Sequence, residues 1–132
     1  MTAPTPNKAS ILLAHGSSDP NWLAPFETLL QRIRGELTDS ARVELAYMEL
    51  ADPSLEHSIR QLADQGYRHI DVLPLFFAAG RHLRKDVPAM LNELQQQLAS
   101  SGKQLTLELH QPIGLEPEMA SAISQVVVRK LS

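Results

Sequence analysis

The chain has 132 residues, of which 43% are hydrophobic and 20% are charged. This length suits one domain, since single domains most often hold about 100–150 residues, and the apolar fraction excludes a disordered chain. A formal net charge of −3 argues against a nucleic-acid binder held by a basic face. The chain has no cysteine, so disulfides and thiolate sites are excluded, and any metal must bind to His, Asp or Glu.

The N-terminal residues contain no apolar run of the kind that a secretory signal needs. No stretch of the chain approaches the roughly 18 consecutive apolar residues of a membrane span. We therefore expect a cytoplasmic protein with a flexible leader over residues 1–9 and a single α/β domain over residues 10–132.

Apolar patterns predict four strands that alternate with four helices. Short apolar runs or a period of two predict strands at 10–14, 43–47, 70–77 and 105–109. Apolar residues spaced by three and four predict helices over 22–37, 55–63, 87–98 and 119–127. Asp19-Pro20 and Asp52-Pro53 are expected to open the first two helices, and residues 78–82 to form a loop. This order predicts a four-stranded parallel sheet with helices on both faces, a flavodoxin-like three-layer sandwich.

Ionisable side chains follow three of the predicted strands, at the edge where open parallel sheets bind ligands. His15 follows the first strand, Glu49 ends the second, and His82 lies in the loop after the third. Two imidazoles and one carboxylate suit Zn²⁺, Co²⁺, Fe²⁺ or Ni²⁺ and leave coordination positions open. Such an open site favours reaction or transfer of the ion over a structural role.

The other histidines are interpreted by their place in the predicted sheet. His110 ends the fourth strand at the same edge, and its role stays open. His57 falls within a predicted helix, and His69 lies at the opposite, amino end of the third strand. Both are interpreted as solvated or capped histidines, because parallel sheets do not place their chemistry there.

Other chemistries lack their motifs. Ser17 and Ser18 lie beside His15, but no G-x-S-x-G elbow is present, and small polar residues after a strand usually cap a helix. Neither a G-x-G-x-x-G sequence nor a P-loop occurs, so a nucleotide would find no phosphate cradle. A phosphoacceptor receiver domain would need an acidic cluster after the first strand, where this chain has His15, Gly16 and Ser17.

Three motifs, in this order along the chain, resemble those of the short, single-domain class II tetrapyrrole chelatases. These enzymes are the sirohydrochlorin cobaltochelatases and ferrochelatases, and the resemblance covers most of the chain, from the first strand to the last helix. The motifs are LLAHGS at 12–17, YMELADPS at 47–54, and LPLFF at 73–77 followed by GRHLRKDVP at 80–88.

The resemblance implies insertion of Co²⁺, Fe²⁺ or Ni²⁺ into sirohydrochlorin without ATP, in the synthesis of cobalamin, sirohaem or a nickel tetrapyrrole. The metal is then a substrate, and no tightly bound cofactor is expected. The family's metal-binding and catalytic His, Glu and His map onto His15, Glu49 and His82. Many members carry an arginine shortly after the first motif, where this chain has Ser18, so no substrate contact is carried over to that turn.

The chemistry of these side chains suits metal insertion. Neutral histidine is a metal ligand near pH 7 and can also accept a pyrrole proton. Sirohydrochlorin is rich in carboxylates, and three cations lie beside His82 at a helix start that would normally prefer acids, which favours a ligand role. These expected tetrapyrrole-binding residues are Arg81, Arg84 and Lys85.

Two further expectations concern function and assembly. A non-catalytic carrier of metal or tetrapyrrole would use the same residues and is the alternative to a chelatase. A macrocycle is broad compared with the cleft of a four-stranded domain, so we expect a homodimer in which two copies supply the walls of the site. No nucleic acid or membrane partner is expected.

Overall fold

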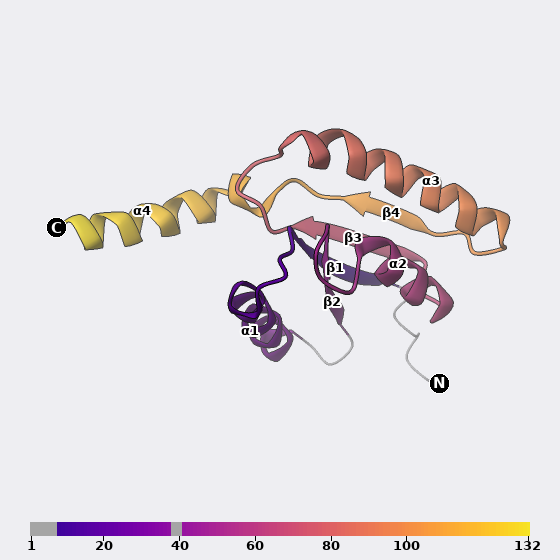
Figure 1. Ribbon diagram of the computed structural model, residues 1–132, viewed down its shortest axis with the longest axis horizontal. Helices are drawn as coiled ribbons and strands as arrows, with labels where there is room; N and C mark the ends of the chain where they lie inside the picture. Colours follow the sequence, from indigo (N-terminus) through magenta and orange to yellow (C-terminus); the bar gives the residue numbers. More distant parts are fainter. Residues whose placement is uncertain (1–7, 38–40) are drawn as a thin grey trace.

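A computed structural model describes residues 8–37 and 41–132, and its centre is one parallel sheet in the order β2-β1-β3-β4 (Figure 1). The strands are β1 (Lys8–Ala14), β2 (Arg42–Tyr47), β3 (His69–Pro74) and β4 (Thr106–Leu109). The helices are α1 (Pro20–Glu36), α2 (Leu55–Asp64), α3 (Val87–Ser100) and α4 (Pro117–Leu131). The predicted α/β class and the four-stranded parallel sheet are confirmed, and β4 lies at one edge of the sheet.

Alternation along the strands sends apolar side chains to both faces of the sheet. Ile11 and Leu13 of β1 and Val72 of β3 are fully buried on the face that α2 and α3 cover. Leu12 and Leu45 lie on the other face, where α1 packs against β2. Helices therefore cover both faces, as predicted.

The strand ends differ from the predicted limits by more than one residue at two places. Lys8 pairs with His69 and Ala9 with Ile70, so these two residues of the expected leader belong to β1. Residues 1–7 of that leader lie outside the described residues. β3 ends at Pro74, three residues before the predicted limit. The N–H of Leu75 still donates to the carbonyl of Leu13 at 2.8 Å, and Leu75 and Phe76 pack against the hydrophobic core.

The starts of the first two helices depend on capping side chains. The carboxylate of Asp19 accepts a hydrogen bond from the backbone N–H of Asn21 at 2.9 Å, which confirms the predicted start of α1. The prediction for α2 was wrong by two residues. Ser54 is its N-cap, and the Ser54 hydroxyl accepts from the N–H of His57 at 3.1 Å, while Pro53 instead bonds through its carbonyl to the N–H of Tyr47.

The loop predicted over residues 78–82 is correct as far as Gly80, but its last two residues, Arg81 and His82, are helical. Residues His82–Asp86 form one π-helical turn, η1, that continues directly into α3. The prediction failed because only Leu83 and Val87 face the core, and a single turn gives too few apolar residues to show a helical period. π-Helical turns often mark functional positions.

Helix α4 projects away from the rest of the domain (Figure 1). None of its residues is buried, and its large apolar side chains are exposed at Val126, Val127, Val128 and Leu131. Its main neighbour is the short 3₁₀ turn η2 (Ile113–Leu115). No helix among residues 8–37 and 41–132 is long and apolar enough to span a membrane.

Candidate functional site

The two turns that follow β1 and β2 bring a histidine and a glutamate into contact. β1 ends at Ala14 and β2 at Tyr47, so His15 and Glu49 leave the sheet at the same edge. The imidazole Nε2 of His15 lies 3.1 Å from Oε2 of Glu49. This edge adjoins the switch in strand order between β1 and β3, where parallel sheets bind ligands.

Backbone contacts hold the two turns together. The N–H of Met48 donates to the carbonyl of Ala14 at 3.0 Å, and the N–H of Glu49 donates to the carbonyl of His15 at 3.1 Å. Gly16 has a φ of +106°, and a Cβ placed there would lie 1.7 Å from the carbonyl oxygen of Glu49. Only glycine allows this approach, because it combines a positive φ with the absence of a side chain.

His82 joins His15 and Glu49 at the wall of a cavity. A hollow of about 440 Å³ is lined by all three predicted ligands and by the starts of α2 and α3. A second hollow of about 300 Å³ is lined by His15 and His82 together with apolar side chains, among them Met48, Phe76 and Leu83. Both volumes fall within the range of small-molecule sites.

The three side chains are open to solvent. The exposed fractions are 56% for His15, 57% for Glu49 and 78% for His82. Ligands that are this exposed can exchange an ion with solvent, and they leave room for a second ligand beside it. This arrangement suits a transferred ion better than a retained one.

Asp86 is a site residue that the sequence analysis missed. Its carboxylate Oδ2 lies 2.5 Å from Nδ1 of His82, one turn earlier in the chain, and Asp86 lines the same cavity. A carboxylate on one imidazole nitrogen orients the ring and leaves the other nitrogen to bind a ligand. The i, i+4 spacing would have revealed this pair, but His82 was expected in a loop and the predicted helix began only at residue 87.

The basic side chains beside His82 are placed differently from one another. Arg81 lines the smaller hollow, next to His15 and His82. Arg84 and Lys85 are exposed on η1 and line neither hollow. Of the three cations, the geometry favours Arg81 for contact with a ligand held in the cavity.

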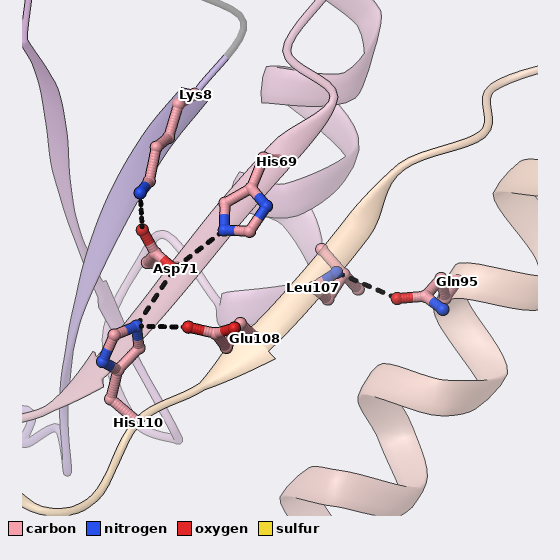
Figure 2. A network of polar contacts seen from close by, with 7 residues as sticks. All are labelled: Lys8, His69, Asp71, Gln95, Leu107, Glu108 and His110. Atoms are coloured by element: carbon pink, nitrogen blue, oxygen red, sulfur yellow. Dashed lines mark hydrogen bonds and ion pairs between the residues drawn. The ribbon is translucent and has the colours of Figure 1, made fainter.

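His110 does not join His15 and His82. Its Nε2 lies 3.0 Å from Oδ1 of Asp71, and Nε2 of His69 lies 3.0 Å from the same oxygen (Figure 2). Burial raises the pKa of the Asp71 carboxyl, but hydrogen bonds from His110 and His69 and the charge of Lys8 outweigh burial and hold that pKa below its usual value. His69 is therefore paired with Asp71, whereas His57 lies exposed on α2.

Comparison with known proteins gives consistent matches. Residues 9–130 match the CbiX family model. The chain is 34% identical over 83 residues to the sirohydrochlorin cobaltochelatase of Methanopyrus kandleri, covering 63% of this chain and 57% of that protein. It is 28% identical over 120 residues to the sirohydrochlorin cobaltochelatase of Sulfurisphaera tokodaii, covering 89% of this chain and 88% of that one.

Solved structures share the fold. The CbiX protein from Marinobacter aquaeolei VT8 is 46% identical, with a TM-score of 0.76 over 94% of this chain and 97% of that one. The sirohydrochlorin chelatase SirB from Bacillus subtilis subspecies spizizenii, in complex with cobalt, has a TM-score of 0.72 at 22% identity. That match covers 89% of this chain and 48% of the SirB chain, so this chain spans about half of that protein.

The close approach at Gly16 predicts the effect of a single methyl group. Gly16→Ala should lower the free energy of unfolding by about 2 kcal/mol or more beyond the strain of its positive φ, because the methyl group must displace the Glu49 backbone. Gly66→Ala is the matched control, since its φ is +99° and an added Cβ meets nothing within 4 Å. Urea unfolding of both variants measures the difference, and equal losses would contradict the role given to Gly16.

Proposed function

The chain belongs to the CbiX family, and we propose that it is a sirohydrochlorin chelatase that inserts Co²⁺ or Fe²⁺ without ATP in cobalamin or sirohaem synthesis. The observation that carries this proposal is the meeting of His15, Glu49 and His82 at one cavity of the sheet edge. The curated relatives support it by name, and solved SirB structures contain cobalt or Fe³⁺. The resemblance found in the motifs agrees with the family match.

We propose that His15, Glu49 and His82 hold the metal substrate before its transfer. Two neutral imidazoles and a carboxylate bind a divalent first-row ion without the strong retention that thiolates would give. Their exposure leaves other coordination positions to water, so the pyrrole nitrogens of the macrocycle can replace water first and protein ligands afterwards. The larger hollow gives the macrocycle its approach.

Metal insertion also releases two protons, one from each of two pyrrole N–H groups, as the ion takes their place. Two imidazole–carboxylate pairs face the cavity, His15 with Glu49 and His82 with Asp86. A carboxylate beside an imidazole stabilises the protonated ring, so each pair can accept one proton as the metal leaves it. We propose that these two pairs are the proton acceptors.

The ligand assignment predicts a loss of turnover with little loss of stability. His15→Ala and His82→Ala should each abolish insertion of Co²⁺ into sirohydrochlorin, because each removes a proposed metal ligand. The fold should stay intact, because both side chains are exposed and contribute little to the core. Glu49→Gln keeps size and hydrogen bonding but removes the charge, so it should lower the rate by about 100-fold, a typical contribution of general acid–base catalysis. Absorbance of the macrocycle at equal folded concentrations measures these rates.

His57→Ala is the control for these variants. His57 is an exposed histidine on α2 that lines neither hollow of the site, so its variant should keep most of the activity. Normal rates for both His15→Ala and His82→Ala would refute the site. A wild-type protein that binds metal and tetrapyrrole but stops after less than one turnover would identify the carrier alternative. Running Co²⁺, Fe²⁺ and Ni²⁺ side by side compares the candidate metals.

The basic residues predict a salt-dependent effect on the tetrapyrrole. Arg81→Gln should weaken sirohydrochlorin binding by about tenfold and leave Co²⁺ binding unchanged, because a charge-assisted hydrogen bond to a carboxylate contributes about 1.5–3 kcal/mol. Arg84→Gln and Lys85→Gln should have smaller effects, since these side chains line neither hollow. Binding titrations at low and high salt should show the losses shrinking as salt rises.

Arg32→Gln is the matched control for charge removal, because Arg32 is exposed near the end of α1 that points away from the site. A loss of tetrapyrrole binding that is the same at every salt concentration would point to damaged packing instead. An equal loss of sirohydrochlorin binding in the Arg32 variant would show that the Arg81 effect comes from the change in net charge alone.

We propose that the protein is a homodimer and that α4 contributes to the contact. An isolated helix of 15 residues is marginal in water, yet α4 buries none of its residues against its own domain. Packing on a second copy would cover its exposed valines and add protein surface to the macrocycle site. The edge at β4 is less suitable for this contact, because Leu105 is only 7% exposed and already part of the core.

Sedimentation at micromolar concentration tests the dimer, which should sediment as twice the chain mass of 14.6 kDa. Val127→Glu with Val128→Glu should shift the protein to monomer, because each change places a charge in the apolar contact. Gln125→Glu on the same helix is the control and should leave the dimer intact. A single 14.6 kDa species, with and without sirohydrochlorin, would refute the proposal.

A further inference from the structure

A second group of histidine and carboxylate side chains lies along β3 and β4, away from the strand ends that carry His15 and Glu49 (Figure 2). His69 and Asp71 alternate with the buried apolar residues Ile70 and Val72 of β3 and point to one face, and Glu108 lies opposite Asp71 in the register of β4. His110 follows β4 directly and also points toward Asp71. None of these four residues lines either hollow of the His15 site.

The distances within this group are close to those of a metal coordination shell. Asp71 Oδ1 lies 3.0 Å from Nε2 of both His69 and His110, and Glu108 Oε2 lies 3.2 Å from Nε2 of His110. One ligand atom each from His69, Asp71 and Glu108 lie within 4.8 Å of one another. Ligands bound at 2.0–2.1 Å in a tetrahedral site are separated by about 3.3 Å, so small side-chain movements would admit an ion.

Charge also favours a cation at this place. Asp71 and Glu108 lie directly opposite each other on neighbouring strands, an arrangement that is unfavourable when both are ionised. Asp71 is only 6% exposed, and a buried carboxylate needs compensating charge. Lys8 supplies part of that charge from 3.4 Å, but its side chain is 63% exposed.

The group is open enough for an ion to enter. The side chains of His69, His110 and Glu108 are 33%, 38% and 56% exposed, while Asp71 forms the buried floor. Helix α1 packs against β2, and β2 and β4 are the two opposite edge strands of the sheet. Among residues 8–37 and 41–132, the exposed sides of the two histidines therefore give a cation an approach to Asp71.

We propose that His69, Asp71, Glu108 and His110 bind a divalent first-row transition metal ion, of the Zn²⁺ or Co²⁺ type, at a site separate from that of the metal substrate. Two imidazoles with two carboxylates favour such ions over Mg²⁺ and Ca²⁺, which prefer oxygen ligands. Four protein ligands, one of them buried, would retain the ion. The ion would link the edge strand β4 to β3. β4 is also held to α3, because the N–H of Leu107 donates a hydrogen bond to the side-chain oxygen of Gln95.

The test measures binding of Co²⁺ alone to the full chain after treatment with a chelator. A background variant, His15→Ala with His82→Ala, removes the substrate site. It should still bind one equivalent of Co²⁺, with the visible absorption of a four-coordinate ion, and its melting temperature should rise with Co²⁺ concentration. Adding His69→Ala and His110→Ala should remove this equivalent, whereas adding His57→Ala should not.

Glu108→Gln provides a second variant in the same background, because Glu108 is exposed and its change leaves the core intact. It should weaken binding of the remaining Co²⁺ by about tenfold, the effect of about 1.4 kcal/mol. No bound Co²⁺ in the background variant, or binding that neither set of changes alters, would overturn the proposal and leave a network of hydrogen bonds. The result is independent of turnover, so this site and the proposed function can fail separately.

Discussion

The close approach of two backbone turns at Gly16 is the constraint on which the rest of the site depends. The turn after β1 and the turn after β2 touch through hydrogen bonds from Met48 and Glu49, and there is no space between them for a Cβ. The parallel pairing of β1 with β2 places the ends of both strands side by side, with Ala14 next to Tyr47. The contact between His15 and Glu49 is thus a product of the sheet and does not rely on flexible loops.

His82 lines the same cavity but is positioned by the start of a helix instead of by a strand end. It begins a π-helical turn whose next residue, Leu83, is 4% exposed and whose following helix starts at the buried Val87. The inner side of the turn is therefore held in the core, while His82 and Asp86 project outward as a hydrogen-bonded pair. The site combines one pair set by strand ends with another set by a helix start, and both offer an imidazole backed by a carboxylate.

The sequence predicted the parts of this structure that depend on periodicity. The strands and helices, the Asp19 cap and the positions of His15 and Glu49 follow from local patterns, because alternation and helical spacing reflect burial directly. The start of α2 was misplaced because Asp52-Pro53 and Ser54 are both plausible caps, and only the contact of Pro53 with Tyr47 decides between them. The His82–Asp86 pair was missed because a single π-helical turn has no detectable period.

Pairing between strands explains what local patterns could not show. His110 was expected near the carboxyl edge with His15, and His69 was expected to be a bystander at the other end of the sheet. The register of β3 against β4 places Asp71 beside Glu108. His69 and His110 both form a hydrogen bond with Oδ1 of Asp71. No spacing along the chain encodes that meeting, because it depends on the register of two strands that are separated by a whole helix.

The two groups of histidines and carboxylates differ mainly in the burial of their acidic member. Glu49 has a side chain that is 57% exposed, so water can replace it on an ion at little cost. Asp71 has a side chain that is 9% exposed, so water has little access to replace it as a ligand of the ion that we propose. At the two proposed sites, similar ligand types would therefore favour release at the strand ends and retention between the strands, because the acidic ligand is exposed in one and buried in the other.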